Sequence, residues 1–254
     1  MFDTHCHLQD ERMEDAQQVI SRAVRAGVRN MLCCGTRQQD WEAVARISSR
    51  YECVRAAFGI HPWFVSGRSS GWLQALKEQL CSSSSTAVGE IGLDHTVDPR
   101  NDKEQAQVFT QQLELAQKLG KPVSIHCRKA WGDLQEILQA RGGLEYGGVI
   151  HSYSGSPELV SVLEKLNCHI SFSGSIVNTR NKRAANSLLQ ISSDRLLIET
   201  DSPDLLPRGL EGPLNEPANL VKIAERIAEL LGKSVEDIAR GTEQNAGALF
   251  KIPV

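Results

Sequence analysis

The sequence predicts a (β/α)8 barrel, because of its length, its β-rich runs and the segments between them. A chain of 254 residues suits one large α/β domain. Short apolar runs occur at 1–8, 29–36, 54–62, 85–94, 121–127, 147–155, 168–176 and 195–203. Longer amphipathic segments separate these runs, and such βα alternation is typical of a parallel barrel. We expect a single domain over residues 1–254.

Helical patterns fill the gaps between the runs. Apolar positions spaced by three and four, or mixed segments with few breakers, predict helices at 14–27, 37–50, 103–119 and 129–141. Ser156 and Pro157 begin a further helix as N-cap and first turn. The serine run at 82–85 is expected to be a loop, and residues 216–249 to form two or three closing helices. A doubly wound sheet is the alternative, but no glycine-rich dinucleotide motif follows the first run.

Composition limits the partners of this chain. It has 28 basic and 31 acidic residues, so its net charge of −3 gives no general attraction to duplex DNA or anionic membranes. No apolar run approaches the ~18 residues of a membrane span, and no signal peptide is expected. The seven irregularly spaced cysteines favour reduced, buried thiols and a cytoplasmic protein. We expect a monomer with no membrane contact and no obligate protein partner.

Chemically active side chains fall at the carboxyl ends of the predicted strands, where barrel enzymes build their sites. These residues are His5, His7, His61, Glu90, His126, His151 and Asp201. Strand alternation puts His5 and His7 on one face, with Asp3 below them. Thr4 and Cys6 then face the helices, so Cys6 is not expected to be a ligand. Glu199 shares a face with Asp201.

One buried histidine is usually an ordinary core residue, but this combination is different. A carboxylate such as Glu90 inside a core costs several kcal/mol unless a cation or strong donors compensate it. Four histidines and two carboxylates that converge on one barrel mouth therefore predict a metal site. His169, at the start of the seventh run, is expected to be structural. The role of His95 stays open.

These motifs resemble those of the TatD family of metal-dependent deoxyribonucleases, which are amidohydrolase-like barrels. They are DTHCH at 3–7, GIHP at 59–62, GEIGLD at 89–94, PVSIHCR at 122–128, HSYSG at 151–155 and ETDSP at 199–203. The order and spacing of the motifs are more specific than any one of them. The resemblance implies a metal-dependent hydrolase that cleaves phosphodiester bonds in DNA, as a 3′–5′ exonuclease does.

The resemblance also implies a ligand set for two divalent metal ions. His5, His7 and Asp201 would hold one ion, and His126 and His151 the other, with Glu90 bridging them. Two metal ions can activate water and stabilise the attacking and leaving oxygens. Asp201 would orient the water and take its proton, so that Asp201, Glu90 and His61 act in catalysis. Histidine-rich ligation favours zinc or manganese over magnesium.

Substrate contacts are expected from His61 and Arg128 to phosphate, and from Trp63 and Tyr153 by stacking. The segment after Asp94, however, is neither aromatic nor basic before Arg100, and Leu214 stands where a basic residue is expected before Asn215. This departure keeps two alternatives open. One is a hydrolase of small amides, esters or phosphoesters with the same metal pair, and the other is a binding protein that keeps an inactive barrel.

Overall fold

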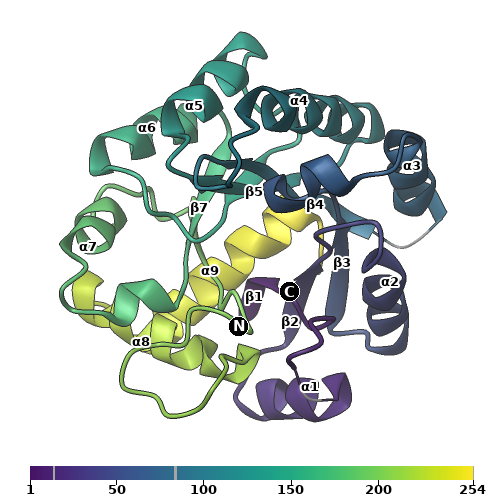
Figure 1. The fold of residues 1–254 in the computed structure, drawn as a ribbon. Helices are drawn as coiled ribbons and strands as arrows, with labels where there is room; N and C mark the ends of the chain where they lie inside the picture. Colours follow the sequence, from purple (N-terminus) through teal and green to yellow (C-terminus); the bar gives the residue numbers. More distant parts are fainter. Residues whose placement is uncertain (14, 83–84, 254) are drawn as a thin grey trace.

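Eight parallel strands form the centre of the computed structural model, which describes residues 1–13, 15–82 and 85–253. The strands are β1 (Phe2–Cys6), β2 (Asn30–Cys34), β3 (Val54–Phe58), β4 (Ser85–Asp94), β5 (Val123–Arg128), β6 (Gly148–Ile150), β7 (Cys168–Phe172) and β8 (Leu196–Ile198). They pair in sequence order. Backbone hydrogen bonds from His7 N to Ser202 O and from Asp201 N to His5 O join the first strand to the last. The predicted barrel is confirmed (Figure 1).

Helices follow the strands and form the outer layer. They are α1 (Ala16–Arg25), α2 (Trp41–Arg50), α3 (Trp72–Ser82), α4 (Asp102–Leu119), α5 (Trp131–Ala140), α6 (Pro157–Lys165), α7 (Lys182–Leu188), α8 (Leu220–Leu231) and α9 (Val235–Phe250). Three 3-10 turns, η1 (Pro62–Gly67), η2 (Gly174–Val177) and η3 (Pro217–Asn219), lie in loops. None of these described helices is long and apolar enough to cross a membrane. Residue 14 of the predicted first helix and residues 83–84 of the predicted serine loop lie outside the described residues.

The predicted strands are too long at their carboxyl ends. β3 stops at Phe58, β6 at Ile150 and β8 at Ile198, several residues before the expected ends. His61, His151 and Asp201 therefore follow their strands instead of lying within them. Residues beyond the last ladder bond can take other backbone conformations, and Asp201 has a φ of 57°. The side chains of all three residues meet at the open end of the barrel.

Alternation along β1 is also interrupted. The ladder between β1 and β2 is irregular between Asp3 and Cys6. Thr4 Oγ1 lies 3.2 Å from Ser171 Oγ on β7, which it reaches across β8 from inside the barrel. The expectation that Thr4 faces the helices is therefore wrong, because the irregularity shifts the pattern. Cys6 packs in the outer core, as expected.

A helix closes the far end of the barrel. Figure 1 shows α9, in yellow, crossing behind the strands, and it contacts β1 and β8. The Phe250 ring lies 5.7 Å from that of Phe2, and both side chains are buried. The inner core contains Phe2, Leu32, Cys34, Ala57, Ala87, Val149 and Leu197 together with Ala246, Leu249 and Phe250 of α9. This apolar floor supports the polar residues at the opposite end.

We predict that Phe250→Ala lowers the free energy of unfolding by about 3–5 kcal/mol, because it leaves a cavity beneath the barrel. Chemical denaturation followed by circular dichroism measures the change. Leu189→Ala is the control, since Leu189 is 58% exposed and its truncation should cost less than about 0.5 kcal/mol. A loss of under about 1 kcal/mol for Phe250→Ala would show that α9 does not support the barrel.

Candidate metal centre

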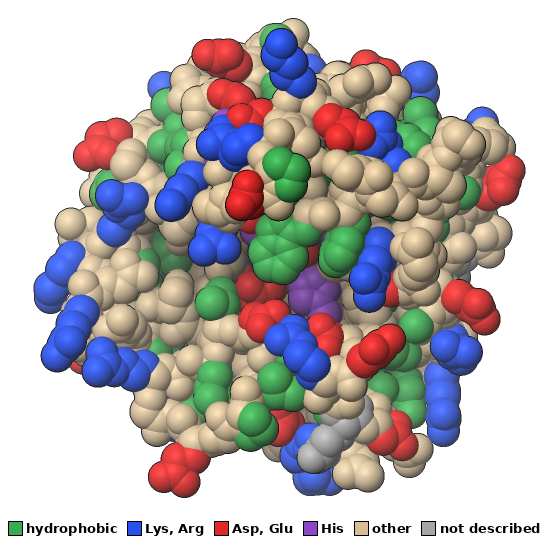
Figure 2. All heavy atoms as spheres, viewed as in Figure 1, with side chains coloured by type: hydrophobic (Ala, Val, Ile, Leu, Met, Phe, Trp, Pro, Cys, Tyr) green, Lys and Arg blue, Asp and Glu red, His purple; other side chains and the backbone are tan. Residues whose placement is uncertain are grey.

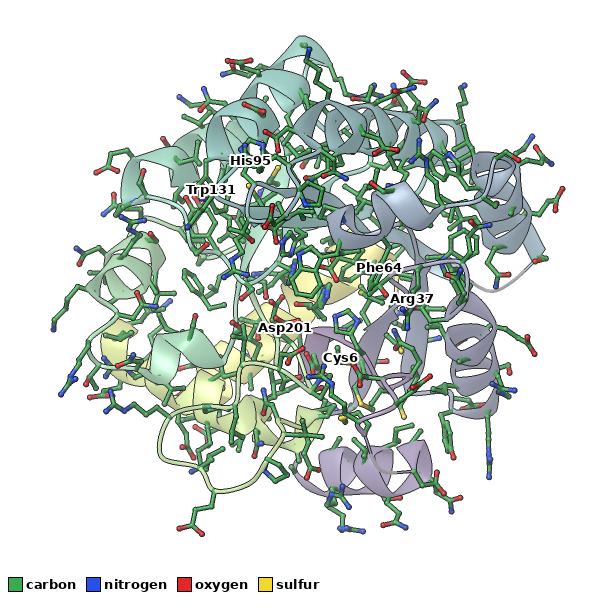
Figure 3. All side chains as sticks on the ribbon, in the orientation of Figure 1. Cys6, Arg37, Phe64, His95, Trp131 and Asp201 are labelled. Atoms are coloured by element: carbon green, nitrogen blue, oxygen red, sulfur yellow. The ribbon has the colours of Figure 1, made fainter. Side chains whose placement is uncertain are left out.

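The residues predicted for the site converge at the open end of the barrel. The structure brings together His5, His7, His61, Glu90, His126, His151 and Asp201, and pairs each of the histidines with a carboxylate. Figure 2 shows a histidine side chain at the bottom of a central hollow, with acidic side chains around it. Asp201, labelled in Figure 3, lies at the middle of the same end. Cys6 and Cys127 pack in the outer core, away from this cluster.

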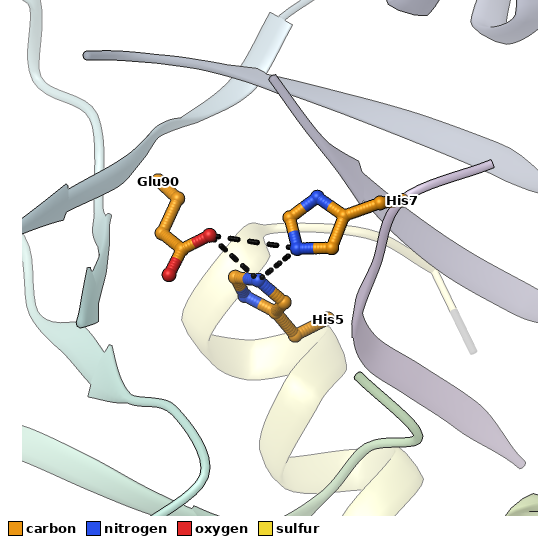
Figure 4. A group of neighbouring side chains, drawn as sticks. All are labelled: His5, His7 and Glu90. Atoms are coloured by element: carbon orange, nitrogen blue, oxygen red, sulfur yellow. Dashed lines mark hydrogen bonds and ion pairs between the residues drawn. The ribbon is translucent and has the colours of Figure 1, made fainter. Parts of the chain in front are cut away.

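Glu90 divides its two oxygens between two histidine pairs. Its Oε2 lies 3.3 Å from His5 Nε2 and 3.5 Å from His7 Nε2, as Figure 4 shows. Its Oε1 lies 3.1 Å from His126 Nδ1 and 2.8 Å from His151 Nε2. The carboxylate thus stands between two sets of imidazole nitrogens, at a position that the two sets share.

Asp201 completes one of these sets. Its Oδ1 lies 3.7 Å from His7 Nε2 and 3.9 Å from His5 Nε2. The Asp201 backbone N–H donates to the carbonyl of His5 at 3.0 Å, which fixes the end of β8 against β1. The side chain of Asp201 is 15% exposed, whereas that of Glu90 is 4% exposed. Asp201 is therefore the carboxylate of this cluster that solvent reaches more easily.

The outward nitrogens of two histidines donate to buried carboxylates. Asp94 Oδ2 accepts from His126 Nε2 at 3.1 Å, and Glu199 Oε1 accepts from His151 Nδ1 at 3.3 Å. When a carboxylate accepts a hydrogen bond from the outward N–H of a neutral imidazole, the inward nitrogen of that ring keeps its lone pair. His126 Nδ1 and His151 Nε2 are therefore available as ligands, and they lie 3.2 Å apart.

The other histidine pair is oriented in the same way. His7 Nδ1 donates to the carbonyl of Cys34 at 2.8 Å, and His5 Nδ1 lies 3.0 Å from the hydroxyl of Ser124. Their Nε2 atoms point inward and lie 3.2 Å apart. Sequence reasoning gave no role to Ser124, Glu199 or the Cys34 carbonyl. Glu199 could have been found as a second carboxylate on the inward face of its strand, but no sequence signal identifies a backbone carbonyl.

Gly92 allows these parts to come close together. It has a φ of 144°, and a Cβ atom there would lie 2.0 Å from the carbonyl oxygen of His126. No other residue fits at this point, because the backbone of β4 touches that of β5. The glycine keeps Glu90 and Asp94, two residues on either side of it, in contact with His126.

His61 has a different environment from the four other histidines. Its Nδ1 accepts from the backbone N–H of Trp63 at 3.1 Å, so the proton of the neutral ring lies on Nε2. That Nε2 is 3.3 Å from Glu90 Oε1. Burial lowers the pKa of His61 to about 4, which keeps the ring neutral. In this tautomer His61 donates to Glu90 and has no inward lone pair for a metal.

The cluster attracts cations. Burial alone would raise the pKa of Glu90, but His61, His151 and His5 hold it well below its usual range. Burial lowers the pKa of His7, yet Asp201 and Glu90 outweigh burial and raise it to about 9. The ionised carboxylates therefore favour positive charge on the inward nitrogens, where protons and metal ions compete.

The donor set fits divalent metal ions. The ligand atoms of His5, His7 and Glu90 lie within 4.8 Å of one another, as do those of His5, His151 and Asp201. Imidazole lone pairs and carboxylate oxygens that converge in this way, with outward nitrogens already hydrogen-bonded, are typical of transition-metal sites.

Of the expected substrate contacts, one is not met. Tyr153 is only 1% exposed, its hydroxyl donates to the carbonyl of Ser156 at 2.7 Å, and its ring packs against Trp131 and Phe172. It is a core residue, because the turn after β6 directs it under α5. Trp63 is 56% exposed and Arg128 is exposed, so both remain accessible.

His95 lies outside the cluster. Its Nε2 is 3.4 Å from Asp133 Oδ2 and 4.0 Å from Asp102 Oδ1, so it stands between the first turns of α4 and α5. Figure 3 places it beside Trp131 and well away from Asp201. His95 therefore lies between two helices, where its Nε2 makes no hydrogen bond to any described residue, and it supplies no ligand to the cluster.

The motifs, the barrel and the histidine–carboxylate cluster agree with one family. A family model described as TatD related DNase matches residues 2–251. The chain belongs to the TatD family. It is 35% identical to the uncharacterized metal-dependent hydrolase YabD of Bacillus subtilis, over 99% of both chains. It is 32% identical to the 3′–5′ ssDNA/RNA exonuclease TatD of Citrobacter koseri, also over 99% of both.

A solved structure of the same family has nearly the same backbone. The TatD homologue YjjV of Escherichia coli K12 superposes with a TM-score of 0.95 at 29% identity, covering 100% of this chain and 98% of the other. The expected family and fold are therefore confirmed.

We predict that Asp94→Asn weakens metal binding about 10- to 100-fold at the half of the centre that contains His126. An asparagine amide can no longer hold the ring proton on Nε2 by charge. Calorimetric titration with zinc or manganese measures the affinity of each site. Asp98→Asn is the matched control, because Asp98 is exposed in the same loop. Equal affinities for Asp94→Asn and the wild type would show that Asp94 does not orient the ligand.

Proposed function

We propose that this protein is a two-metal phosphodiesterase that removes nucleotides from the 3′ ends of single-stranded DNA. One observation carries the proposal, namely the position of Glu90, whose two oxygens face two different histidine pairs. A carboxylate between two sets of ligands offsets the repulsion between two bound cations. The description of the Citrobacter koseri relative as a 3′–5′ exonuclease supports the substrate and the polarity.

The cluster would hold two ions with different ligands. His5, His7 and Asp201 would bind one ion and His126 and His151 the other, with Glu90 between them. When bound, such ions lower the pKa of water and stabilise the attacking and leaving oxygens. Imidazole ligands favour zinc or manganese over magnesium.

Asp201 is the residue that would orient the attacking water and take its proton. It is the more exposed of the two central carboxylates, and its backbone bond to His5 fixes its position. A general base must lie within hydrogen-bond reach of its proton, and a fixed backbone keeps it there. His61 would position Glu90 by donating from Nε2, or would donate this N–H to a phosphate oxygen in place of Glu90 when substrate enters.

Substrate contacts would come from Trp63 and Arg128. The Trp63 indole N–H donates to Asp94 at 2.7 Å, so the ring is held in place with 56% of the side chain exposed. A fixed, exposed ring beside His61 suits stacking against a terminal base. Arg128 is the last residue of β5 and forms no ion pair in the described part of the chain, so its planar fork is free to bind phosphate.

A hydrolase of small amides, esters or phosphoesters is the second candidate. The segment after Asp94 supports it, because it offers no basic side chain before Arg100, and Arg100 pairs with Asp102. The third sequence-based alternative, an inactive barrel, has less support, because the complete ligand set is assembled. For the cellular location we propose the cytoplasm, since most of the thiols are free and buried.

The decisive experiment compares substrates and metal content in one preparation. We expect about two metal ions per chain and release of nucleotides from 3′-labelled single-stranded DNA. Chelation should abolish this activity, and zinc or manganese should restore it. A panel of small esters, amides and phosphoesters tests the second candidate in parallel. Cleavage of the panel without cleavage of DNA would replace the nuclease proposal.

We predict that Asp201→Asn lowers kcat about 100- to 10,000-fold on DNA, because the general base is removed. Glu90→Gln should lower both metal content and activity, since it removes the shared negative charge. Asp98→Asn is the control, as it changes one exposed carboxylate in the same way. Nuclease activity that survived both Asp201→Asn and Glu90→Gln would come from a contaminant, and the proposal would be wrong.

A further inference from the structure

The segments that follow β7 and β8, including the first turn of α7, carry a group of cations that the proposed reaction does not use. We call Arg180, Lys182, Arg183 and Arg208 the basic rim. All strands are parallel, so these loops open at the same end of the barrel as the metal centre. The hydroxyl of Ser152, next to His151, lies 2.8 Å from that of Ser173, where the loop after β7 begins. The segment that carries Arg180 and leads to Lys182 and Arg183 in the first turn of α7 therefore starts beside the metal centre.

The charges of the basic rim are not neutralised. All four side chains are exposed, and none forms an ion pair with an acidic residue in the described part of the chain. The pKa of Glu158 on α6 is lowered mainly by hydrogen bonds from its own backbone N–H and from Ser156, and less by the charge of Arg183, with which it forms no ion pair. Figure 2 shows Lys and Arg side chains gathered on the side of the mouth where Figure 1 places α7.

Cations in the loops after β1, β3 and β4, in contrast, form ion pairs. Arg12 pairs with Asp10 and Asp204, Arg68 with Glu104, and Arg100 with Asp102. An ion pair cancels most of the field of its members at a distance. The pairing of Asp204 also matters for the basic rim, because this acidic residue of the β8 loop is thereby kept from offsetting Arg208. Arg37, after β2, and Arg128, at the end of β5, also form no ion pair in the described part of the chain, but the β7–β8 side carries four such exposed cations.

Hydrogen bonds hold the two loops of the basic rim together. Asn178 Oδ1 accepts from the backbone N–H of Arg180 at 3.1 Å and from the guanidinium of Arg208 at 3.4 Å. At Gly174 a Cβ atom would lie 1.9 Å from the carbonyl oxygen of Leu205, so the two loops touch through their backbones. Cations on loops that are fixed in this way lose less entropy when they bind a ligand.

We propose that the basic rim binds the phosphates of a single-stranded nucleic acid whose terminal nucleotide lies at the metal centre. This inference rests on the proposed function and names the path of the substrate. A row of cations that follows the backbone, together with an aromatic ring for the bases, is the usual arrangement for single strands. Here Trp63 lies at the metal centre and the basic rim lies beyond His151. The net charge of −3 makes this positive surface a local exception.

The test is a charge-neutralised variant with a matched control. The rim variant is Arg180→Gln with Lys182→Gln and Arg183→Gln, and it leaves Arg208 to hold Asn178. The control variant is Lys118→Gln with Lys165→Gln and Lys233→Gln. These three exposed lysines lie at the carboxyl ends of α4, α6 and α8, at the far end of the barrel. Both variants change the net charge by the same amount.

Binding is measured by fluorescence anisotropy with labelled oligothymidylate in the presence of chelator, so that the result does not depend on cleavage. Each phosphate contact contributes about 0.7 to the slope of log affinity against log salt, so the rim variant should lose about 2 units of slope. We also expect its affinity to fall roughly tenfold at low salt, while the control variant matches the wild type. In the cleavage assay, the rim variant should have a higher KM on long oligonucleotides and unchanged turnover of a dinucleotide.

Equal binding by the rim variant and the wild type would overturn the inference, whatever the outcome of the nuclease assay. So would an equal loss in the control variant, because only net charge would then matter. Phosphatidylserine vesicles are the third arm. Loss of vesicle binding in the rim variant, with DNA binding intact, would assign the surface to a membrane instead. Failure of the nuclease proposal alone would leave the binding result standing, so the two failures are distinguishable.

Discussion

The buried carboxylate of Glu90 is the constraint around which the rest of this centre is arranged. A negative charge in a barrel core is tolerated only with compensating positive charge or strong donors. Four imidazoles and the N–H of His61 surround it, each within about 3.5 Å of one of its oxygens. Since these donors come from strands that are far apart in the sequence, the carboxylate specifies how the barrel end must close.

The outward nitrogens of the four histidines have hydrogen-bond partners, just as the inward nitrogens face Glu90. Asp94, Glu199, Ser124 and the Cys34 carbonyl each hold one ring nitrogen. The inward nitrogens therefore already face Glu90 before any metal ion arrives, and a metal ion would displace their protons without reorienting the rings. Trp63 extends this arrangement outward, because its indole N–H reaches the same Asp94 that orients His126. A base stacked on Trp63 would thus touch a residue two hydrogen bonds from the metal centre.

The cations on the surface around the metal centre differ in whether they form ion pairs. Cations beside β1, β3 and β4 are paired with carboxylates, while those beside β7 and β8 are free. The segment after Asp94 and the basic rim therefore differ in their unpaired positive charge. Under the proposed function, an extended strand would leave the centre toward the basic rim, since four exposed cations without an ion pair to any described residue lie there.

The sequence by itself determined the barrel, the order of its strands and the identity of the residues at its mouth. Alternating β-rich and amphipathic segments leave few other topologies, and polar residues at strand ends stand out against apolar runs. Only the tertiary structure decided where each strand stops, that Thr4 turns inward, that Tyr153 is buried and that His95 lies between two helices. These outcomes depend on a ladder irregularity, on strand ends and on loop packing, which are contacts between distant segments. The ring orientations were decided in the same way, because a backbone carbonyl such as that of Cys34 has no signature in the sequence.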